Sequence, residues 1–167
     1  MIRHLVAALT LLCPSAILHA QAAPITVFVV RHAEKGPENP DPSLTPQGHQ
    51  RATALARVLG DSHVTAVFAS EFKRAQETVE PLAKFAGLTT AIVPAAMLDS
   101  LVVRLRALPP GSRVVVASHS NLVHLIVEKL SGVSVPPLAD TDYDRLVVVT
   151  VIAGGRGDAV VLRYGEK

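Results

Sequence analysis

The stretch Ile25-Thr26-Val27-Phe28-Val29-Val30-Arg31-His32-Ala33-Glu34-Lys35 decides the fold, because an apolar run ends there in a guanidinium, an imidazole and a carboxylate. Residues 25–30 are rich in β-branched side chains and nearly all apolar, which predicts a parallel strand buried on both faces. Ligands of open α/β sheets bind at the carboxyl ends of the strands. Arg31 and His32 therefore lie where such sheets carry out chemistry, although such a pair taken alone is more often an ordinary surface pair.

The first 22 residues predict a signal peptide. Arg3 provides a basic start, residues 5–18 form a mostly apolar stretch too short to span a bilayer, and Ala20-Gln21-Ala22 is a small-x-small cleavage signal. We therefore expect cleavage after Ala22 and a periplasmic or secreted protein with no stable membrane span. The alternative is an uncleaved N-terminal anchor, although neither a longer apolar extension nor a basic stop-transfer cluster follows.

Residues 23–167 are predicted to form one domain of 145 residues. At this length folding removes roughly 68–70% of the surface of the unfolded chain, which is enough for a core without covalent support. The only cysteine, Cys13, lies in the predicted signal peptide, so the domain has no disulfide. Without Arg3, 15 basic residues face 14 acidic ones, and this balance argues against a nucleic-acid partner.

Predicted strands and helices alternate along the domain after a proline-containing loop at residues 33–43. The order is a helix capped by Thr45 and ended by Gly60, a strand at 64–69, a helix from about Phe72 that Pro81 breaks or kinks, a strand at 88–93, a helix at 98–108, a strand at 113–118, a helix at 121–130, and a hairpin of 146–152 with 159–163. This alternation predicts an α/β fold, a three-layer α/β/α sandwich with a mostly parallel central sheet and a C-terminal β-hairpin.

Three of the predicted strands lead into polar residues that suit phosphate chemistry. The first strand leads to Arg31 and His32, the second to Ser70 with Arg74 one helical turn later, and the strand at 113–118 to His119. Guanidinium groups match phosphate oxygens bidentately, and imidazoles act as nucleophiles or acids near neutral pH. Two arginines and two histidines at one edge of the sheet therefore predict a pocket for a phosphate dianion.

The combined pattern resembles the histidine phosphatase superfamily, also called phosphoglycerate-mutase-like. The resemblance rests on the following motifs, in order over nearly the whole mature chain: Arg31-His32-Ala33-Glu34-Lys35, Asp41-x-x-Leu44-Thr45-x-x-Gly48 with Arg51-Ala52, Ser70-x-x-x-Arg74-Ala75-x-x-Thr78, and Ser118-His119-Ser120. The chain is similar to the short branch, without the large insertions of the mutases and acid phosphatases. The resemblance implies that His32 is the nucleophile that becomes phosphorylated, and that Arg31, Arg74 and His119 hold the transferred phosphoryl group.

Covalent catalysis by His32 needs one ring nitrogen unprotonated and the other N–H held by an acceptor. Phosphate would move to His32, and water would then release it. Because the transition state carries its charge on the equatorial oxygens, Arg31, Arg74 and His119 would supply mainly electrostatic stabilisation, and we expect neither a metal ion nor another cofactor.

The acid that would protonate the leaving group has two interpretations. Glu34, two residues after the nucleophile, is a candidate general acid, and it is equally a candidate ionised partner of Arg31, Arg74 or Lys35. In acid-phosphatase relatives an Asp follows the second histidine, where this chain has Ser120. A missing strong acid would suit good leaving groups, such as those of phosphoanhydrides or phosphohistidine.

Other polar residues carry weaker signals. Ser118, Ser120 and Asn121 at a helix N-terminus either hold an anion or cap the helix, and Ser120 is kept as a substrate-binding candidate. Residues 140–144 predict an acidic turn, and no spacing indicates a metal site. Solvation or ordinary packing is expected for His49, Arg51, Arg57, Glu77 and His124.

The sequence thus predicts an exported, metal-independent phosphatase acting on a phosphomonoester or related phosphorylated small molecule through a phosphohistidine on His32. One alternative is a protein phosphohistidine phosphatase, against which the predicted export counts. The other is a catalytically weak phospholigand-binding module that retains the pocket.

Overall fold

The computed structural model describes residues 22–166, so the predicted signal peptide lies outside the described residues except for Ala22. The elements follow in this order: β1 (Ile25–Arg31), α1 (Pro46–Leu59), the 3₁₀ helix η1 (Gly60–Ser62), β2 (Ala66–Ala69), α2 (Lys73–Ala86), β3 (Thr90–Ile92), α3 (Leu98–Arg106), β4 (Arg113–Ser118), α4 (Ser120–Ser131), β5 (Arg145–Val151) and β6 (Asp158–Arg163).

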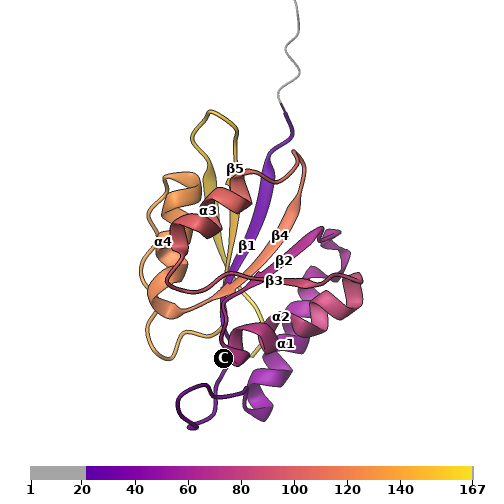
Figure 1. Cartoon of the computed structure of the whole chain (residues 1–167), viewed down its shortest axis with the longest axis vertical. Helices are drawn as coiled ribbons and strands as arrows, with labels where there is room; N and C mark the ends of the chain where they lie inside the picture. Colours follow the sequence, from indigo (N-terminus) through magenta and orange to yellow (C-terminus); the bar gives the residue numbers. More distant parts are fainter. Residues whose placement is uncertain (1–21, 167) are drawn as a thin grey trace, which may run out of the picture.

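The strands form one sheet in the order β3-β2-β4-β1-β5-β6. The pairs β2·β3, β2·β4 and β1·β4 are parallel, whereas β5 is antiparallel to β1 and β6 is antiparallel to β5. Figure 1 shows α3 and α4 on one face of the sheet and α1 and α2 on the other. The predicted three-layer α/β/α sandwich with a C-terminal hairpin is confirmed.

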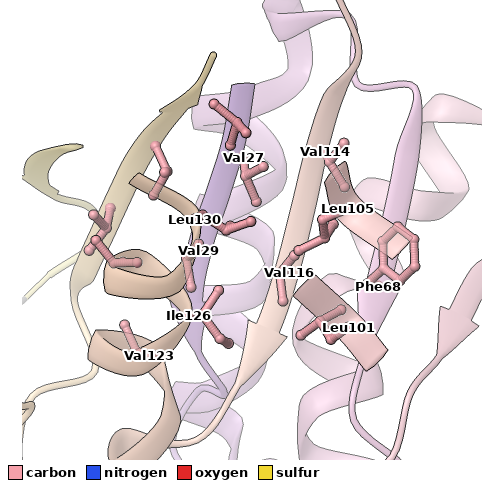
Figure 2. Close-up of a cluster of buried hydrophobic side chains, with 14 of the residues drawn as sticks. Val27, Val29, Phe68, Leu101, Leu105, Val114, Val116, Val123, Ile126 and Leu130 are labelled. Carbon is pink, nitrogen blue, oxygen red and sulfur yellow. The ribbon is translucent and has the colours of Figure 1, made fainter. Parts of the chain in front are cut away.

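Side chains of β1 contribute alternately to two hydrophobic clusters, as the apolar run predicted. Val27 and Val29 pack toward α3 and α4, where Figure 2 shows them near Ile126 and Leu130. Phe28 and Val30 belong to the cluster on the α1 and α2 face. A strand with both faces in a core is rigid, so the residues that follow it are held at a defined position.

Pro81 does not break α2, which continues to Ala86, because the apolar face of this helix stays packed on the sheet and outweighs one missing backbone hydrogen bond. The predicted end of the first helix is confirmed: α1 ends at Leu59 with Gly60 as its C-cap, and the 3₁₀ helix η1 follows directly. The predicted cap is confirmed: the Thr45 hydroxyl accepts a hydrogen bond from the Gly48 N–H at 3.1 Å.

The register of the parallel strands brings their carboxyl ends to one level. Arg31 of β1 pairs with Ser118 of β4, and Ala69 of β2 pairs with Ala117 of β4. The residues that follow the three strands therefore meet at one edge of the sheet. Within the described part of the chain, no helix has the length and apolar character needed to cross a membrane.

Candidate active site

His32 directly follows β1, and its backbone N–H donates to the Ser118 carbonyl at 2.8 Å. Its ring is buried, with 4% of the residue exposed. The ring Nδ1 lies 2.8 Å from the Ala33 carbonyl oxygen. A carbonyl only accepts hydrogen bonds, so Nδ1 carries the proton and Nε2 keeps a free lone pair. The tautomer required of a phosphate-accepting imidazole is thus built into the backbone.

The pKa of His32 is lowered from 6.5 to about 3, mainly by burial and also by the neighbouring Arg31, His119 and Arg74, while the hydrogen bond to Ala33 opposes the shift. An imidazole with this pKa is neutral near pH 7, which is the nucleophilic state.

His119 caps the N-terminus of α4 immediately after β4, and its ring centroid lies 5.4 Å from that of His32. Its Nε2 is 2.9 Å from the Ser70 hydroxyl at the end of β2, and the Phe72 ring packs edge-on at 5.1 Å. These contacts fix the imidazole from two sides. Burial, followed by the charge of Arg74, lowers the pKa of His119 to about 4, with Glu71 opposing the shift.

Arg31 is buried and contacts the segment at residues 140–144, which the sequence predicted only to be an acidic turn. Its Nη1 donates to the carbonyls of Ala139 and Asp140 at 3.1 and 2.8 Å. Its Nη2 donates to the Tyr143 hydroxyl at 3.3 Å, and the guanidinium carbon lies 4.0 Å from the centre of the Tyr143 ring. The turn therefore holds Arg31 through both of its terminal guanidinium nitrogens. The Nε of Arg31 has no partner among the described residues.

Arg74 lies in the first turn of α2, stacked at 4.3 Å on Phe72. Its Nη1 is 3.6 Å from an Asp41 carboxylate oxygen, and its buried Nε also lacks a partner within residues 22–166. Unpaired buried N–H groups are costly unless a ligand accepts from them. Arg31 and Arg74 thus each keep one guanidinium N–H without a partner among the described residues, and both side chains line the same cleft.

An open cleft of about 520 Å³ brings the predicted residues together. Its lining includes Arg31, His32, Lys35, Arg74, His119 and Ser120. Ser120, the first residue of α4, thus lies where a substrate-binding role requires it. None of the residues that line this cleft is acidic. Among the described residues, no group of three His, Cys, Asp or Glu side chains is arranged to hold a metal ion.

Glu34 does not line the cleft and pairs with none of its three expected partners. Arg51 holds its carboxylate instead, with Nε at 2.9 and 3.0 Å from the two oxygens and Nη2 at 2.6 Å from Oε1. This geometry supports the ion-partner interpretation of Glu34 and leaves it without access to a leaving group. The expectation that Arg51 is solvated is wrong, because only 6% of the residue is exposed.

Arg51 also binds the end of the chain. Its Nη1 donates to the Tyr164 carbonyl at 3.1 Å and its Nη2 donates to the Glu166 carbonyl at 2.9 Å. The α1 guanidinium therefore joins the segment after β1 to the segment after β6. Neither contact is visible in the sequence, since the partners are separated by more than a hundred residues.

Two further contacts fix the backbone that carries the His32 acceptor. The Ala33 N–H donates to the Thr78 hydroxyl at 2.8 Å, and the Glu34 carbonyl accepts from the Thr45 N–H at 2.9 Å. Residues 33 and 34 are thus held from α2 on one side and from the start of α1 on the other. Thr78 appeared in a motif, but its spacing alone did not indicate this role.

Glu77 also departs from expectation. It is half-buried rather than solvated, and its carboxylate accepts from the Leu44 N–H at 2.7 Å. It therefore fixes the loop that leads into α1 and does not approach the cleft lining.

The fold and the site define a class of phosphoryl-transfer enzymes that use a histidine. Residues 27–97 match the family described as Histidine phosphatase superfamily (branch 1). The fold is similar to that of the protein histidine phosphatase SixA complexed with tungstate, with a TM-score of 0.70 and 24% identity over 83% of this chain and 96% of that one. The segment 27–97 is thus similar in sequence to the histidine phosphatase superfamily, and the chain as a whole shares the fold of that structure.

Two other solved structures share the fold. A mycobacterial glucosyl-3-phosphoglycerate phosphatase with inorganic phosphate gives a TM-score of 0.66 and 18% identity over 83% of this chain and 96% of that one. A protein described as mycobacterial hydrolase 1 gives a TM-score of 0.66 and 14% identity over 84% of this chain and 99% of that one. No curated protein matches the chain.

The His32 ring should be neutral at pH 6. A long-range ¹H–¹⁵N spectrum should show the Nδ1–H tautomer, whereas an imidazole of ordinary pKa about 6.5 is mostly protonated at that pH. Since the folded-state pKa is lowered to about 3, the unfolded chain binds this proton more readily below pH 6.5, and the fold loses stability as the pH falls from there. A protonated His32 at pH 6 would contradict the assignment.

The Arg51–Glu34 pair should show energetic coupling. Arg51→Met leaves a buried carboxylate without its partner and should cost about 3–5 kcal/mol of unfolding free energy in urea. Adding Glu34→Gln should cost less than the sum of the single changes by about 0.5–3 kcal/mol. Arg57→Met, on the exposed side of α1, is the matched control and should change stability by about 0.5 kcal/mol or less. Additive losses would refute the coupling.

Proposed function

We propose that the protein is an exported phosphatase that hydrolyses a phosphorylated small molecule through a phosphohistidine on His32, with no metal ion required. The observation that carries this proposal is the Nδ1 hydrogen bond to the Ala33 carbonyl, which leaves Nε2 as the nucleophilic nitrogen of a cleft-lining residue. The guanidinium groups of Arg31 and Arg74 line the same cleft and provide the positive charge that a phosphate dianion needs.

In the first step, the His32 Nε2 lone pair attacks phosphorus and forms the N–P bond. The bond from phosphorus to the leaving oxygen breaks, and that oxygen takes the electron pair. Nδ1 keeps its proton throughout, and the Ala33 carbonyl stabilises the positive charge that the ring acquires. The guanidinium groups of Arg31 and Arg74 stabilise the equatorial oxygens of the transition state.

In the second step, water attacks the phosphorus of the phosphohistidine. The N–P bond breaks, its electron pair returns to Nε2, and both water protons leave with the released phosphate. His32 is restored as the neutral Nδ1–H tautomer. The low pKa that burial gives His32 favours this departure, because it makes the imidazole a good leaving group.

The absence of an acidic side chain from the cleft lining favours substrates with good leaving groups. A leaving oxygen that is stable as an anion does not require protonation as it departs. Phosphoanhydrides meet this condition better than alkyl phosphates.

A second candidate is the removal of phosphate from histidine side chains of proteins. The open cleft without an acid supports it, and so does the fold similarity to a structure described as a protein histidine phosphatase. The N-terminal segment counts against this candidate, because a substrate protein would then have to be met outside the cytoplasm.

The proposal of export rests on Arg3, on the apolar stretch at 5–18 and on Ala20-Gln21-Ala22. When the full chain is expressed in a bacterium, mass spectrometry of the product should give a chain beginning at Ala23, located in the periplasm or the medium. A chain that retains residues 1–22 in the membrane fraction would support the anchor alternative, and one that retains them in the cytoplasm would refute export.

His32→Ala should lower turnover of 4-nitrophenyl phosphate by at least about 10³-fold, measured in the presence of a chelator, because it removes the proposed nucleophile. Rapid quench of the unsubstituted protein should trap acid-labile, alkali-stable phosphate on His32. The variant should remain folded and bind phosphate through Arg31 and Arg74.

The matched control is His49→Ala, an exposed histidine on α1 outside the cleft lining, which should retain full activity. Turnover that survives in His32→Ala would refute the nucleophile assignment. Bound phosphate with neither label nor turnover in the unsubstituted protein would instead identify a phospholigand-binding module.

A further inference from the structure

Lys35 gives the cleft a third cationic side chain beside Arg31 and Arg74. An Asp41 carboxylate oxygen lies 3.6 Å from Arg74 Nη1 and partly offsets its charge. His32 and His119 are neutral near pH 7 because burial lowers both pKa values. The exposed Lys35 side chain is therefore the cation of this lining to which the transfer step assigns no role.

The backbone places the Lys35 stem at a fixed point beside the cleft. Lys35 forms an isolated antiparallel bridge with Leu44, and the Gly36 N–H donates to the Ser43 carbonyl at 2.9 Å. From this anchored backbone, four methylene groups let the ammonium reach ligands of different length.

No described carboxylate neutralises Lys35. Its sequence neighbour Glu34 forms an ion pair with Arg51 instead. Lys35 itself takes part in no ion pair among residues 22–166. Asp41 lies 3.6 Å from Arg74, and both of its oxygens accept from the Lys73 N–H at the start of α2, outside the cleft lining.

We propose that Lys35 binds a second anionic group of the substrate, so that the preferred substrates are phosphoanhydrides. This inference rests on the proposed function and names its substrate class. The terminal phosphoryl group lies against Arg31, Arg74 and His32, and the next phosphate lies against Lys35. Two observations carry it: the lining is cationic and without an acid, and it includes Lys35, which pairs with no described carboxylate.

The chemistry explains why such a cleft needs no general acid. His32 Nε2 attacks the terminal phosphorus, the bond to the bridging oxygen breaks, and the bridging oxygen takes the electron pair and departs as part of the second phosphate. Lys35 stabilises the negative charge that grows on this leaving group. Water then cleaves the N–P bond as in the second step above, so the reaction consumes one water for each anhydride bond.

The kinetic test compares inorganic pyrophosphate with 4-nitrophenyl phosphate, both in chelator, for the full chain and its variants. Lys35→Met should lower kcat/KM for pyrophosphate by about 10- to 100-fold, the effect of losing one charge-assisted hydrogen bond. The loss on 4-nitrophenyl phosphate, whose leaving group carries no second phosphate, should stay below about threefold. Lys35→Arg should retain most of the pyrophosphate activity because it keeps the charge.

Lys73→Met is the matched control. Lys73 is an exposed lysine one residue before Arg74 and does not line the cleft, so its removal changes the net charge without touching the substrate. Lys73→Met should change kcat/KM by no more than about twofold for either substrate, since exposed charges are screened by solvent and salt. Equal losses on both substrates in Lys35→Met would show that Lys35 acts on the transferred phosphoryl group and would overturn the inference, as would no loss.

A binding measurement separates failure of this inference from failure of the proposed catalysis. In the His32→Ala background, calorimetry with pyrophosphate should show about tenfold or greater weakening on Lys35→Met, whereas phosphate binding should be unchanged. The expected difference in pyrophosphate affinity does not depend on whether the protein is catalytically active. Equal affinity of the two variants for pyrophosphate would refute the role of Lys35 even if His32 is the nucleophile.

Discussion

The hydrogen bond from His32 Nδ1 to the Ala33 carbonyl is the constraint on which the rest of the site depends. It decides which ring nitrogen carries the proton and which is free to attack. This hydrogen bond fixes the tautomer only as long as the peptide that carries the Ala33 carbonyl keeps its orientation. The Thr78 hydroxyl fixes residue 33, and Thr45 and Arg51 fix residue 34, so helices α1 and α2 both serve the geometry of a single imidazole.

The same positive charges perform two tasks in this cleft. In the proposed reaction Arg31 and Arg74 bind the phosphate, and without a ligand they also help to keep His32 neutral by lowering its pKa. A protonated imidazole would be repelled by the arginines and could not act as a nucleophile. Charge that holds the substrate therefore also holds the nucleophile in its reactive form, and burial strengthens both effects by excluding water.

The sequence was sufficient for the fold and for the convergence of four site residues. The run at 25–30 predicted a strand buried on both faces, and the carboxyl ends of parallel strands meet at one edge, so Arg31, His32 and His119 were predictable from order alone. Arg51 was not, because its place on a mostly polar helix face predicts solvation. Only the path of residues 33–45 brings Glu34 over α1 and buries the pair, and no local pattern encodes that path.

The division of labour between the sheet and the loop gives the site its chemical character. In the proposed reaction the sheet edge supplies a nucleophile and a phosphate-binding site that any phosphorylated ligand can use. The loop after β1 begins with the adjacent charges of Glu34 and Lys35, and the ion pair with Arg51 holds Glu34 outside the cleft lining. Because Glu34 is used for structure, the cleft is left with cations and no acid, and this combination favours leaving groups that already bear negative charge. The Arg51–Glu34 ion pair, which helps to orient the nucleophile, thus also determines the kind of bond that the site can break.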